Sequence, residues 1–451
     1  MISIKTNKYI FIILTFGSFI FAMSTTITAV MLPSIMDAFL ISAGDAQWLS
    51  SGATLVSGIT IPIAAYFIKR SSSKKYFLLV TTIFSAGTLL SAVSPNYSLL
   101  LIGRLIQAVG SGMIMPFSQV VVLNIYPKNK HGTVMGIFTM AGSTAPIVAP
   151  IFAGLVTDNY GFQSVFFFLL IAGLIILLLG FIFMKNVTET YREQFPYIPI
   201  VFSSFGFLGL LVGLGNMSMN SIFRIQTGGF MMFGLFCLVL FVRMQLRSPE
   251  PHLNLRIFQN LDFRTSVIII MLVSLAVMGN AMFMPLYAQS ILGYSATVYA
   301  LVTLPGSIVL SVSTMLSGKL YDMKGPKLLL ISGAFFLPVG SIIGIFFNYT
   351  SGLLHLGFVS FLHAFTAGTL NTSATILGLS ILKGKDRVDG SSILNTLRQI
   401  SLAIASAASI VIYSMVKNTF GEIPGVKAVY ASFLIYGLLV LYFILMFFRK
   451  K

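Results

Sequence analysis

The stretch Gly103–Pro116, GRLIQAVGSGMIMP, places an arginine inside a long apolar segment, with a glutamine one helical turn farther along. Arg104 and Gln107 are three residues apart, so in a helix they lie on one face. A charged side chain in a bilayer costs about 2.5–3.5 kcal/mol on insertion scales, so it usually meets a polar cavity or partner. We therefore expect this face to line a polar interior. The alternative is an arginine near a helix end that reaches to the membrane surface.

The composition around this stretch is that of a polytopic membrane protein. The chain has 451 residues, 57% of them hydrophobic and 9% charged, whereas soluble domains carry about 25% charged residues. A net charge of +17 would suggest a nucleic-acid partner in a soluble protein. Here we expect none, because basic residues collect in the cytoplasmic loops of membrane proteins. The first apolar segment runs on through residues 28–33 without a clear cleavage site, so we expect a retained span and not a signal peptide.

Windows of about 20 apolar residues predict an all-α fold with fourteen membrane spans. Six spans, two inserted spans and six further spans give three units, residues 1–190, 191–262 and 263–451. The predicted spans are 9–33, 47–68, 76–94, 98–124, 132–157, 162–184, 197–217, 227–243, 264–288, 296–318, 327–347, 352–381, 392–416 and 427–448. Residues 244–262, with Pro249 and Pro251, read as a polar linker, and no segment is left for a soluble domain.

The basic residues support this span count and give an orientation. With a cytoplasmic amino terminus and alternating loops, the Lys and Arg residues outside are Arg224, Lys417 and Lys427, and those within spans are Arg104 and Arg398. The rest of the 28 fall inside, as the positive-inside rule requires. Both termini are therefore expected in the cytoplasm.

The acidic residues exclude some mechanisms. All 11 fall in loops or near span ends, so no carboxylate lies in the middle of a predicted span. Such a carboxylate is the usual carrier of coupling protons and the usual counter-charge for a cationic substrate. There is no GxxxxGK[ST] loop for ATP. Four His and one Cys form no metal-ligand or nucleophile cluster. We expect a protein that is not an enzyme and has no metal and no cofactor.

Two stretches are suited to moving or sealing helices. In the fifth span, Gly142 and Ala145 begin a stripe of small residues that permits close helix contact, and Pro146 and Pro150 each remove a backbone hydrogen bond. At the end of the tenth span lies GKLYDMKGPK, 318–327. There Gly318 allows close approach, Gly325 opens a tight turn, and Asp322 is placed to accept from a neighbouring helix end or to pair with Lys327. The alternative for the fifth span is a helix that serves only for packing, and the alternative for residues 318–327 is a basic cytoplasmic loop without a gating role.

Polar residues mark other spans. Arg398 and Gln399 lie one turn into the thirteenth span, where the arginine either faces a cavity or reaches to the surface. His363 and Asn371 make part of the twelfth span polar, and Asn280 does so in the ninth. A lone membrane histidine is more often a hydrogen-bonded packing residue than a proton carrier.

Together these motifs resemble the major facilitator superfamily, in its fourteen-span drug:proton antiporter branch, over essentially the whole chain. Residues 104–116 look like the family's fourth-span motif, whose arginine is implicated in proton transfer, and 142–154 resemble its fifth-span antiporter motif. Residues 318–327 are similar to the superfamily's signature loop, with its acid at Asp322. The first copy of that loop, 66–70, is eroded and lacks its acid.

Further matches to this branch lie at 26–35 and 47–48, at 251–258, and at Pro285-Leu286-Tyr287, Gln289 and 292–295. Span five and the Lys-Arg loop look closest to lincomycin-resistance-type exporters of low-GC Gram-positive bacteria. Many relatives carry an Asp at the position of Ser24, so neutral, zwitterionic and anionic amphiphiles stay open beside cationic drugs. We expect Ser24, Thr25, Asn280, Tyr287, Gln289 and Asn371 to line the cavity.

The resemblance implies a bacterial cell-membrane transporter, a monomer in the lipid bilayer, that works by alternating access between two six-helix halves. We expect proton-coupled export of a small amphipathic substrate, with Arg104, Gln107, Arg398, Gln399 and His363 as candidates for coupling and transport. The same fold could flip a lipid or lipid precursor. A membrane sensor or assembly partner without transport is the remaining alternative.

Overall fold

The computed structural model describes residues 4–191, 195–217 and 225–449, and in them the chain forms fourteen long α-helices and no strand. All fourteen are long and apolar enough to cross a membrane, so the predicted all-α, fourteen-span fold is confirmed. Of the residues used in the charge count and acid inventory, Arg192, Glu193, Arg224, Lys450 and Lys451 lie outside the described residues. The helices are α1 (Ile4–Phe39), α2 (Ala43–Arg70), α3 (Ser73–Ala92), α4 (Tyr97–Ile125), α5 (His131–Tyr160), α6 (Phe162–Phe183), α7 (Tyr197–Met217), α8 (Phe230–Arg247), α9 (Leu261–Leu286), α10 (Ala296–Lys324), α11 (Pro326–Ile345), α12 (Leu353–Ser380), α13 (Gly384–Phe420) and α14 (Glu422–Arg449).

Several helices are longer than the apolar windows that predicted them, because a helix continues through polar turns until a cap stops it. The thirteenth window, 392–416, grows to 384–420 in α13. Capping side chains mark the starts: Ser72 accepts from Lys75 N before α3, and Asn96 accepts from Leu99 N before α4. Hydropathy finds the membrane core of a helix, whereas capping decides its ends.

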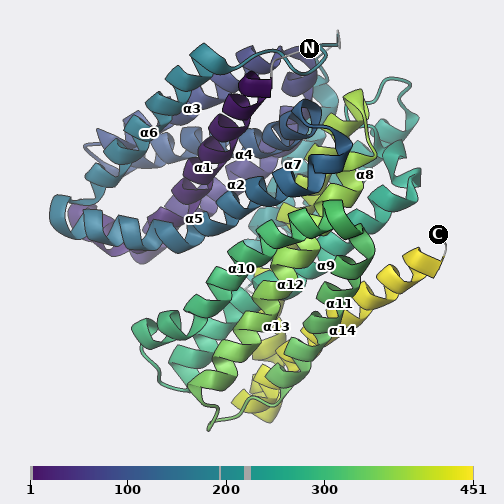
Figure 1. The fold of residues 1–451 in the computed structure, drawn as a ribbon. Coiled ribbons are helices and arrows are strands. Elements are labelled where there is room, and N and C mark those ends of the chain that lie inside the picture. Colours follow the sequence, from purple (N-terminus) through teal and green to yellow (C-terminus); the bar gives the residue numbers. More distant parts are fainter. Residues whose placement is uncertain (1–3, 192–194, 218–224, 450–451) are drawn as a thin grey trace.

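The helices form two bundles, which we call the amino-terminal bundle (α1–α6) and the carboxy-terminal bundle (α9–α14). In Figure 1 the purple and blue helices gather apart from the green and yellow ones. Pairs such as α3 with α4 and α1 with α5 pack within the first, and α11 with α14 and α9 with α12 within the second. The bundles meet where α5 packs on α10 and α2 on α13.

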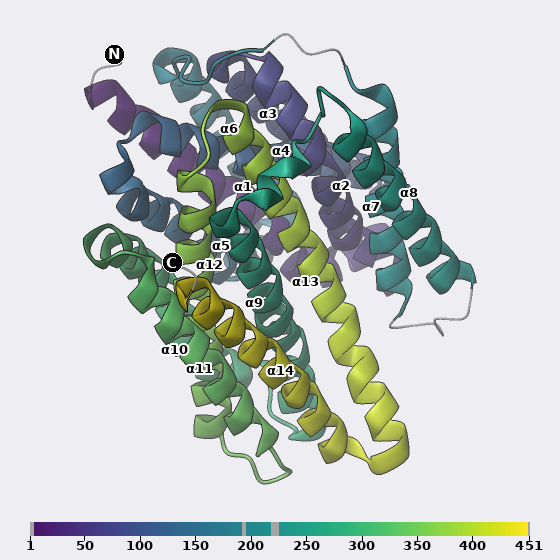
Figure 2. The same ribbon diagram turned by 90° about the vertical axis from the view of Figure 1, so that its right-hand side faces the viewer.

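Helices α7 and α8 pack on each other at the edge of this junction. Helix α7 contacts both α2 and α13, and so touches both bundles. Figure 2 shows the pair on the flank of the molecule beside α2. A Cβ added at Gly58 of α2 would lie 3.2 Å from Leu211 of α7 and 3.5 Å from Gln399 of α13. Helix α7, with α8 packed on it, therefore covers this side of the line along which the bundles meet.

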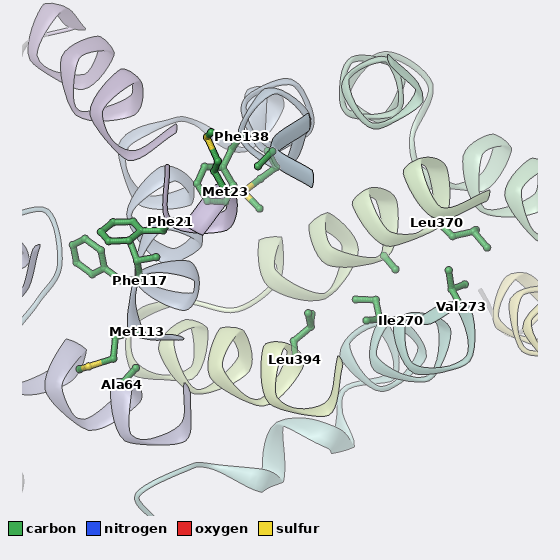
Figure 3. Packing of buried hydrophobic residues seen from close by; sticks show 14 of the residues in the cluster. Phe21, Met23, Ala64, Met113, Phe117, Phe138, Ile270, Val273, Leu370 and Leu394 are labelled. Atoms are coloured by element: carbon green, nitrogen blue, oxygen red, sulfur yellow. The ribbon is translucent and has the colours of Figure 1, made fainter. Parts of the chain in front are cut away.

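Each bundle has its own packed apolar interior. In Figure 3, Phe21, Phe117 and Phe138 lie together on the amino-terminal side, while Val273 and Leu370 lie on the other. The outer surfaces are apolar as well. Along α6, for example, the residues exposed at helical spacing are Phe167, Ile171, Leu174 and Leu178. Such a surface suits lipid, since a bilayer removes the cost of exposing apolar side chains to water.

One end of the molecule, which we call the basic end, gathers the charged turns. It is formed by the carboxyl ends of α2, α4, α10 and α12 and the amino ends of α3, α5, α11 and α13, as the hydrogen bonds described below show. The basic side chains on these segments are Lys69, Arg70, Lys74, Lys75, Lys128, Lys130, Lys319, Lys324, Lys327, Lys383, Lys385 and Arg387.

Candidate functional site

Arg104 lies inside the amino-terminal bundle and is held by neutral groups. It is 2% exposed, and its Nη1 donates to Gln107 Oε1. Gln107 Nε2 donates in turn to Thr88 Oγ1 at 2.7 Å, and Thr88 Oγ1 to the Phe84 carbonyl at 2.7 Å. The guanidinium carbon lies 5.9 Å from the centre of the Phe166 ring. Helical spacing thus correctly predicted that Arg104 and Gln107 share a face.

The glycines of the same stretch explain why Arg104 is so deeply enclosed. A Cβ at Gly103 would lie 2.7 Å from Ser91 N, and one at Gly110 would lie 2.8 Å from Phe84 Cβ, both on α3. On the other side of α4, a Cβ at Gly112 would lie 2.5 Å from the Ser57 carbonyl of α2. The stretch therefore lies between two closely packed helices, with Arg104 in the shared interior.

Asp322 joins the two bundles at the basic end. Its Oδ1 accepts from Gly132 N at 2.7 Å, and its Oδ2 accepts from Thr133 N at 2.6 Å and Thr133 Oγ1 at 2.7 Å. These donors belong to the first turn of α5, where helix N–H groups have no partner within the helix and the helix dipole favours a negative charge. The ammonium of Lys327 instead lies 5.9 Å from the Phe448 ring centre. The sequence left two partners open for Asp322, a neighbouring helix end and Lys327. In the structure Asp322 binds the helix end.

The contact requires close approach of α5 and α10. A Cβ at Gly318 would lie 2.7 Å from Gly136 Cα, and one at Gly136 would lie 3.0 Å from the Met315 carbonyl. Gly325 then ends α10 with a φ of 73°, a conformation that favours glycine, and Pro326 begins α11.

Lys69 of α2 joins the bundles on the opposite side of the junction, as Asp322 of α10 does on the first side. Here the signature loop contributes a positive side chain, where the loop at Asp322 contributes a negative one. Lys69 lies three residues before Ser72, the cap of α3, just as Asp322 lies three residues before Gly325, the cap of α11. Lys69 Nζ is 3.2 Å from Asp389 Oδ1 near the start of α13. The eroded signature loop thus still joins the bundles, but the acid is supplied by α13.

The linker between α8 and α9 is part of this contact. Lys69 Nζ donates to the His252 carbonyl at 2.7 Å, and Asn254 N donates to Asp389 Oδ2 at 3.1 Å. A hydrogen bond of 3.2 Å joins His252 Nε2 to the Pro62 carbonyl of α2. Burial and the nearby Lys69 lower the pKa of His252 to about 3, against a weaker opposite effect of the Pro62 carbonyl. The sequence predicted only a polar linker here; the structure makes it a buried connection between the bundles.

Further hydrogen bonds join the bundles at the same end. Arg387 Nη1 donates to Asn124 Oδ1 at 2.5 Å and to the Leu123 carbonyl at 3.2 Å. His131 Nδ1 and Ser380 Oγ are 3.1 Å apart. Ser391 Oγ and Asn395 Nδ2 each donate to Gln119 Oε1 at 2.8 Å. Farther from this end, one bond crosses the junction among the described residues, from Thr144 Oγ1 to Ser311 Oγ at 3.1 Å.

The alanines of the small-residue stripe on α5 are buried, whereas Gly142 is half-buried. Ala145, Ala149 and Ala153 are fully enclosed, and Pro146 and Pro150 lie within an unbroken helix. Gly142 has room, since a Cβ there would meet only Met115 Cε at 3.9 Å. A role in gating stays a prediction.

The predicted cavity residues are distributed over different environments. Ser24 is buried and donates to the Phe21 carbonyl, whereas Thr25 and Gln289 are exposed. Asn280 accepts from Tyr430 at 2.9 Å, and Tyr287 donates to the Asn348 carbonyl at 2.7 Å, both inside the carboxy-terminal bundle. Asn371 is half-buried.

His363 is 1% exposed and packs within the carboxy-terminal bundle. Its Nδ1 is 3.0 Å from the Val359 carbonyl, and its Nε2 has no hydrogen-bond partner among the described residues. The rings of Tyr430 and Phe433 lie 6.3 and 6.1 Å away. A second buried histidine, His252, was not among the residues singled out from the sequence, because a linker position gives no sign of burial.

Two bundles of six helices, with paired contacts at one end, are the architecture of a secondary transporter. The chain matches the Major Facilitator Superfamily over residues 14–406, and it belongs to this family. It is therefore a membrane transporter and not an enzyme.

Relatives agree with the fourteen-span drug-exporter branch. The lincomycin resistance protein LmrB of Bacillus subtilis (strain 168) is 31% identical over 411 residues, which cover 89% of this chain and 84% of that relative. The probable multidrug resistance protein EmrY of Escherichia coli (strain K12) is 24% identical over 410 residues, covering 89% and 79%. The crystal structure of the human organic anion transporter MFSD10 (TETRAN) has a TM-score of 0.71 at 12% identity, covering 97% and 99%, and shows the likeness of fold alone.

Proposed function

We propose that this transporter exports small amphipathic molecules from a bacterial cell in exchange for protons. It works as a monomer in the plasma membrane, with the basic end and both termini in the cytoplasm. Its similarity to the lincomycin resistance protein LmrB and the probable multidrug resistance protein EmrY supports export of drug-like compounds. The orientation rests on the basic residues, because cytoplasmic loops of membrane proteins carry an excess of Lys and Arg.

The observation that carries the proposal is the set of polar contacts between the bundles at the basic end. Asp322 with α5 and Lys69 with Asp389 lie on opposite sides of the junction and connect the two bundles there. A few hydrogen bonds and one ion pair can be broken and remade, whereas an apolar interface of this length would not separate readily. We infer that units 1–190 and 263–451 rock about this junction, and that the contacts stabilise the state closed to the cytoplasm.

Proton coupling is inferred from the need for an energy source. Export against a gradient requires a second ion, because the sequence contains no ATP-binding loop. Arg104 is the leading candidate for a residue that acts in coupling, and His363 is the second. Among the described residues the acids lie in loops or within two turns of a helix end, so a carboxylate in the middle of a span does not compete with them.

The test is flux in proteoliposomes that contain the purified full chain. An imposed pH gradient should drive uptake of an amphipathic probe into vesicles that have the protein inverted, and an ionophore that abolishes the gradient should stop it. Unchanged uptake after collapse of the gradient would refute proton exchange. Movement of labelled phospholipid between leaflets, with no flux of any soluble probe, would instead support lipid flipping.

A further inference from the structure

Arg398 lies on the face of α13 that looks toward the amino-terminal bundle. Ser391 and Asn395 define this face, since both donate to Gln119 of α4. Arg398 follows them by seven and three residues, so helical periodicity places it on the same face, farther from the basic end. Its neighbour Gln399 lies near Gly58 of α2. Arg398 thus stands just beyond the contacts that close the basic end.

The guanidinium of Arg398 has no partner among the residues that the structure describes. It is half-buried, and no hydrogen bond, ion pair or ring contact joins it to any described residue. The other enclosed arginines differ: Arg104 is bonded to Gln107, and Arg387 is bonded to Leu123 and Asn124. A cation within a membrane span normally has a counter-charge or hydrogen bonds, and those in transporters mark substrate or ion pathways.

The described part of the chain does not supply a counter-charge at this depth. Asp389, the nearest acid along α13, is already paired with Lys69 at the basic end. Asp386 accepts from Asn254 Nδ2 at 3.0 Å in the linker contact. Asp322 is held by α5. The neutralising group must then come from a molecule that enters between the bundles.

We propose that Arg398 binds the anionic group of the transported molecule, a carboxylate or a phosphate on an amphipathic body. The planar guanidinium matches these groups through two parallel N–H···O bonds, which gives both attraction and orientation. The apolar part of the transported molecule then packs against residues of the membrane-spanning helices near Arg398. This assignment rests on the proposed function and names its substrate class.

Binding can be measured with three probes that share one aromatic body: pyrenebutyrate, the corresponding alcohol and the corresponding trimethylammonium. Energy transfer from Trp48, the chain's single tryptophan, to pyrene reports occupancy in the detergent-solubilised full chain. The variants are Arg398→Gln and Arg398→Lys. Arg243→Gln, which removes an exposed charge on α8, is the matched control.

The expected result is that Arg398→Gln weakens pyrenebutyrate binding about 10- to 100-fold, the scale of a lost charge-assisted hydrogen bond. Binding of the alcohol should be nearly unchanged, Arg398→Lys should retain part of the affinity, and Arg243→Gln should match the wild type. Equal losses for all three probes would mean that Arg398 only supports the fold, and no loss for any would mean a merely solvated arginine. Either result overturns the proposal, as would tightest binding of the trimethylammonium probe.

Vesicles distinguish a free amphiphile from a lipid. If phosphatidylglycerol displaces pyrenebutyrate where phosphatidylcholine does not, the anionic group is a lipid phosphate; if neither displaces it, the group belongs to a free compound. Flux separates this inference from the proposed function. If proton-driven flux does not depend on Arg398, the proposed function stands and the anion site at Arg398 is refuted. If binding depends on Arg398 but no proton-driven flux is seen, the anion site stands and proton-coupled export is refuted.

Discussion

Lys69 and Asp389 form an ion pair across the junction of the two bundles, with 3.2 Å between Nζ and Oδ1, and both side chains are almost wholly enclosed. On the opposite side Asp322 contacts the start of α5. The two sides are related by position in the sequence but opposite in charge. One side depends on a helix amino terminus for its positive partner, and the other on a lysine.

Removing one partner of the Lys69–Asp389 pair should destabilise the protein strongly. A broken buried pair costs about 3–5 kcal/mol because it leaves an uncompensated charge, whereas an apolar pair of similar size is often tolerated. We therefore expect Lys69→Met and Asp389→Leu each to lower the melting temperature in detergent, and the double variant to lose less than the sum of the two. A fully additive loss would contradict the pairing.

The control for this cycle is the ion pair of Lys417 and Glu422, which are 2.8 Å apart and exposed. Because water screens this pair, Lys417→Met should leave the melting temperature unchanged.

Asp322→Asn should open the basic end. The amide keeps one acceptor oxygen, so one of the bonds to Gly132 and Thr133 is lost along with the favourable charge at the helix terminus, at a cost of about 1–3 kcal/mol. Ser391 is buried in the junction at the basic end, where its Oγ donates to Gln119, so a cysteine placed there reports access to the junction. In a Cys237→Ser background, Ser391→Cys should react with an impermeant maleimide faster in the Asp322→Asn variant. An unchanged labelling rate would show that Asp322 does not hold this end closed.

Gly318→Ala should separate α5 from α10. The added methyl group would lie 2.7 Å from Gly136 Cα, and the obstacle is backbone, which cannot move aside as a side chain can. We expect a loss of about 1–3 kcal/mol and reduced flux. Gly215→Ala is the matched control, since a Cβ there meets nothing within 4 Å among the described residues. Equal stability of the two variants would refute the close approach.

The sequence was sufficient for the number of helices and for placing Arg104 and Gln107 on one helix face, because hydropathy and helical spacing are local properties. It was not sufficient for the surroundings of that face. Spacing shows which residues share a side of a helix, but not which neighbouring helix that side meets. Only the structure shows that Gly103 packs on α3 and that the interior around Arg104 belongs to one bundle.

The role of Lys69 was missed for a related reason. Compared with the signature loop at Asp322, the earlier loop lacks its acid and reads as a degraded copy. Its partner Asp389 is distant in the sequence, and the ion pair exists only once α2 and α13 are side by side. A lysine three residues before a helix cap, and an acid near the start of another helix, were the available signals.

Stability should fall with acidification through His252. Burial lowers the pKa of this imidazole to about 3 in the folded chain, while in the unfolded chain it is near 6.5. Between these values the unfolded state binds the extra proton, so stability is full above about pH 6.5 and is lost toward pH 3, by at most about 1.4 kcal/mol per pH unit. The decrease in melting temperature from pH 7 to pH 5 should be smaller in His252→Gln than in the wild type. If His252→Gln keeps the wild-type slope, His252 is not the titrating group.

Arg104→Gln should uncouple transport from protons without preventing substrate movement. The substitution removes the charge inside the amino-terminal bundle and the bond from Arg104 to Gln107, whereas the bond from Gln107 Nε2 to Thr88 Oγ1 does not involve residue 104. We expect uptake driven by a pH gradient to fall at least tenfold, and exchange of labelled for unlabelled substrate without a gradient to continue. Thr88→Val removes the hydroxyl that accepts from Gln107 but leaves the charge of Arg104, so it should reduce gradient-driven uptake only slightly. Loss of both activities in Arg104→Gln would assign Arg104 a structural role, and retention of both would remove it from the coupling path and leave His363 as the next residue to replace.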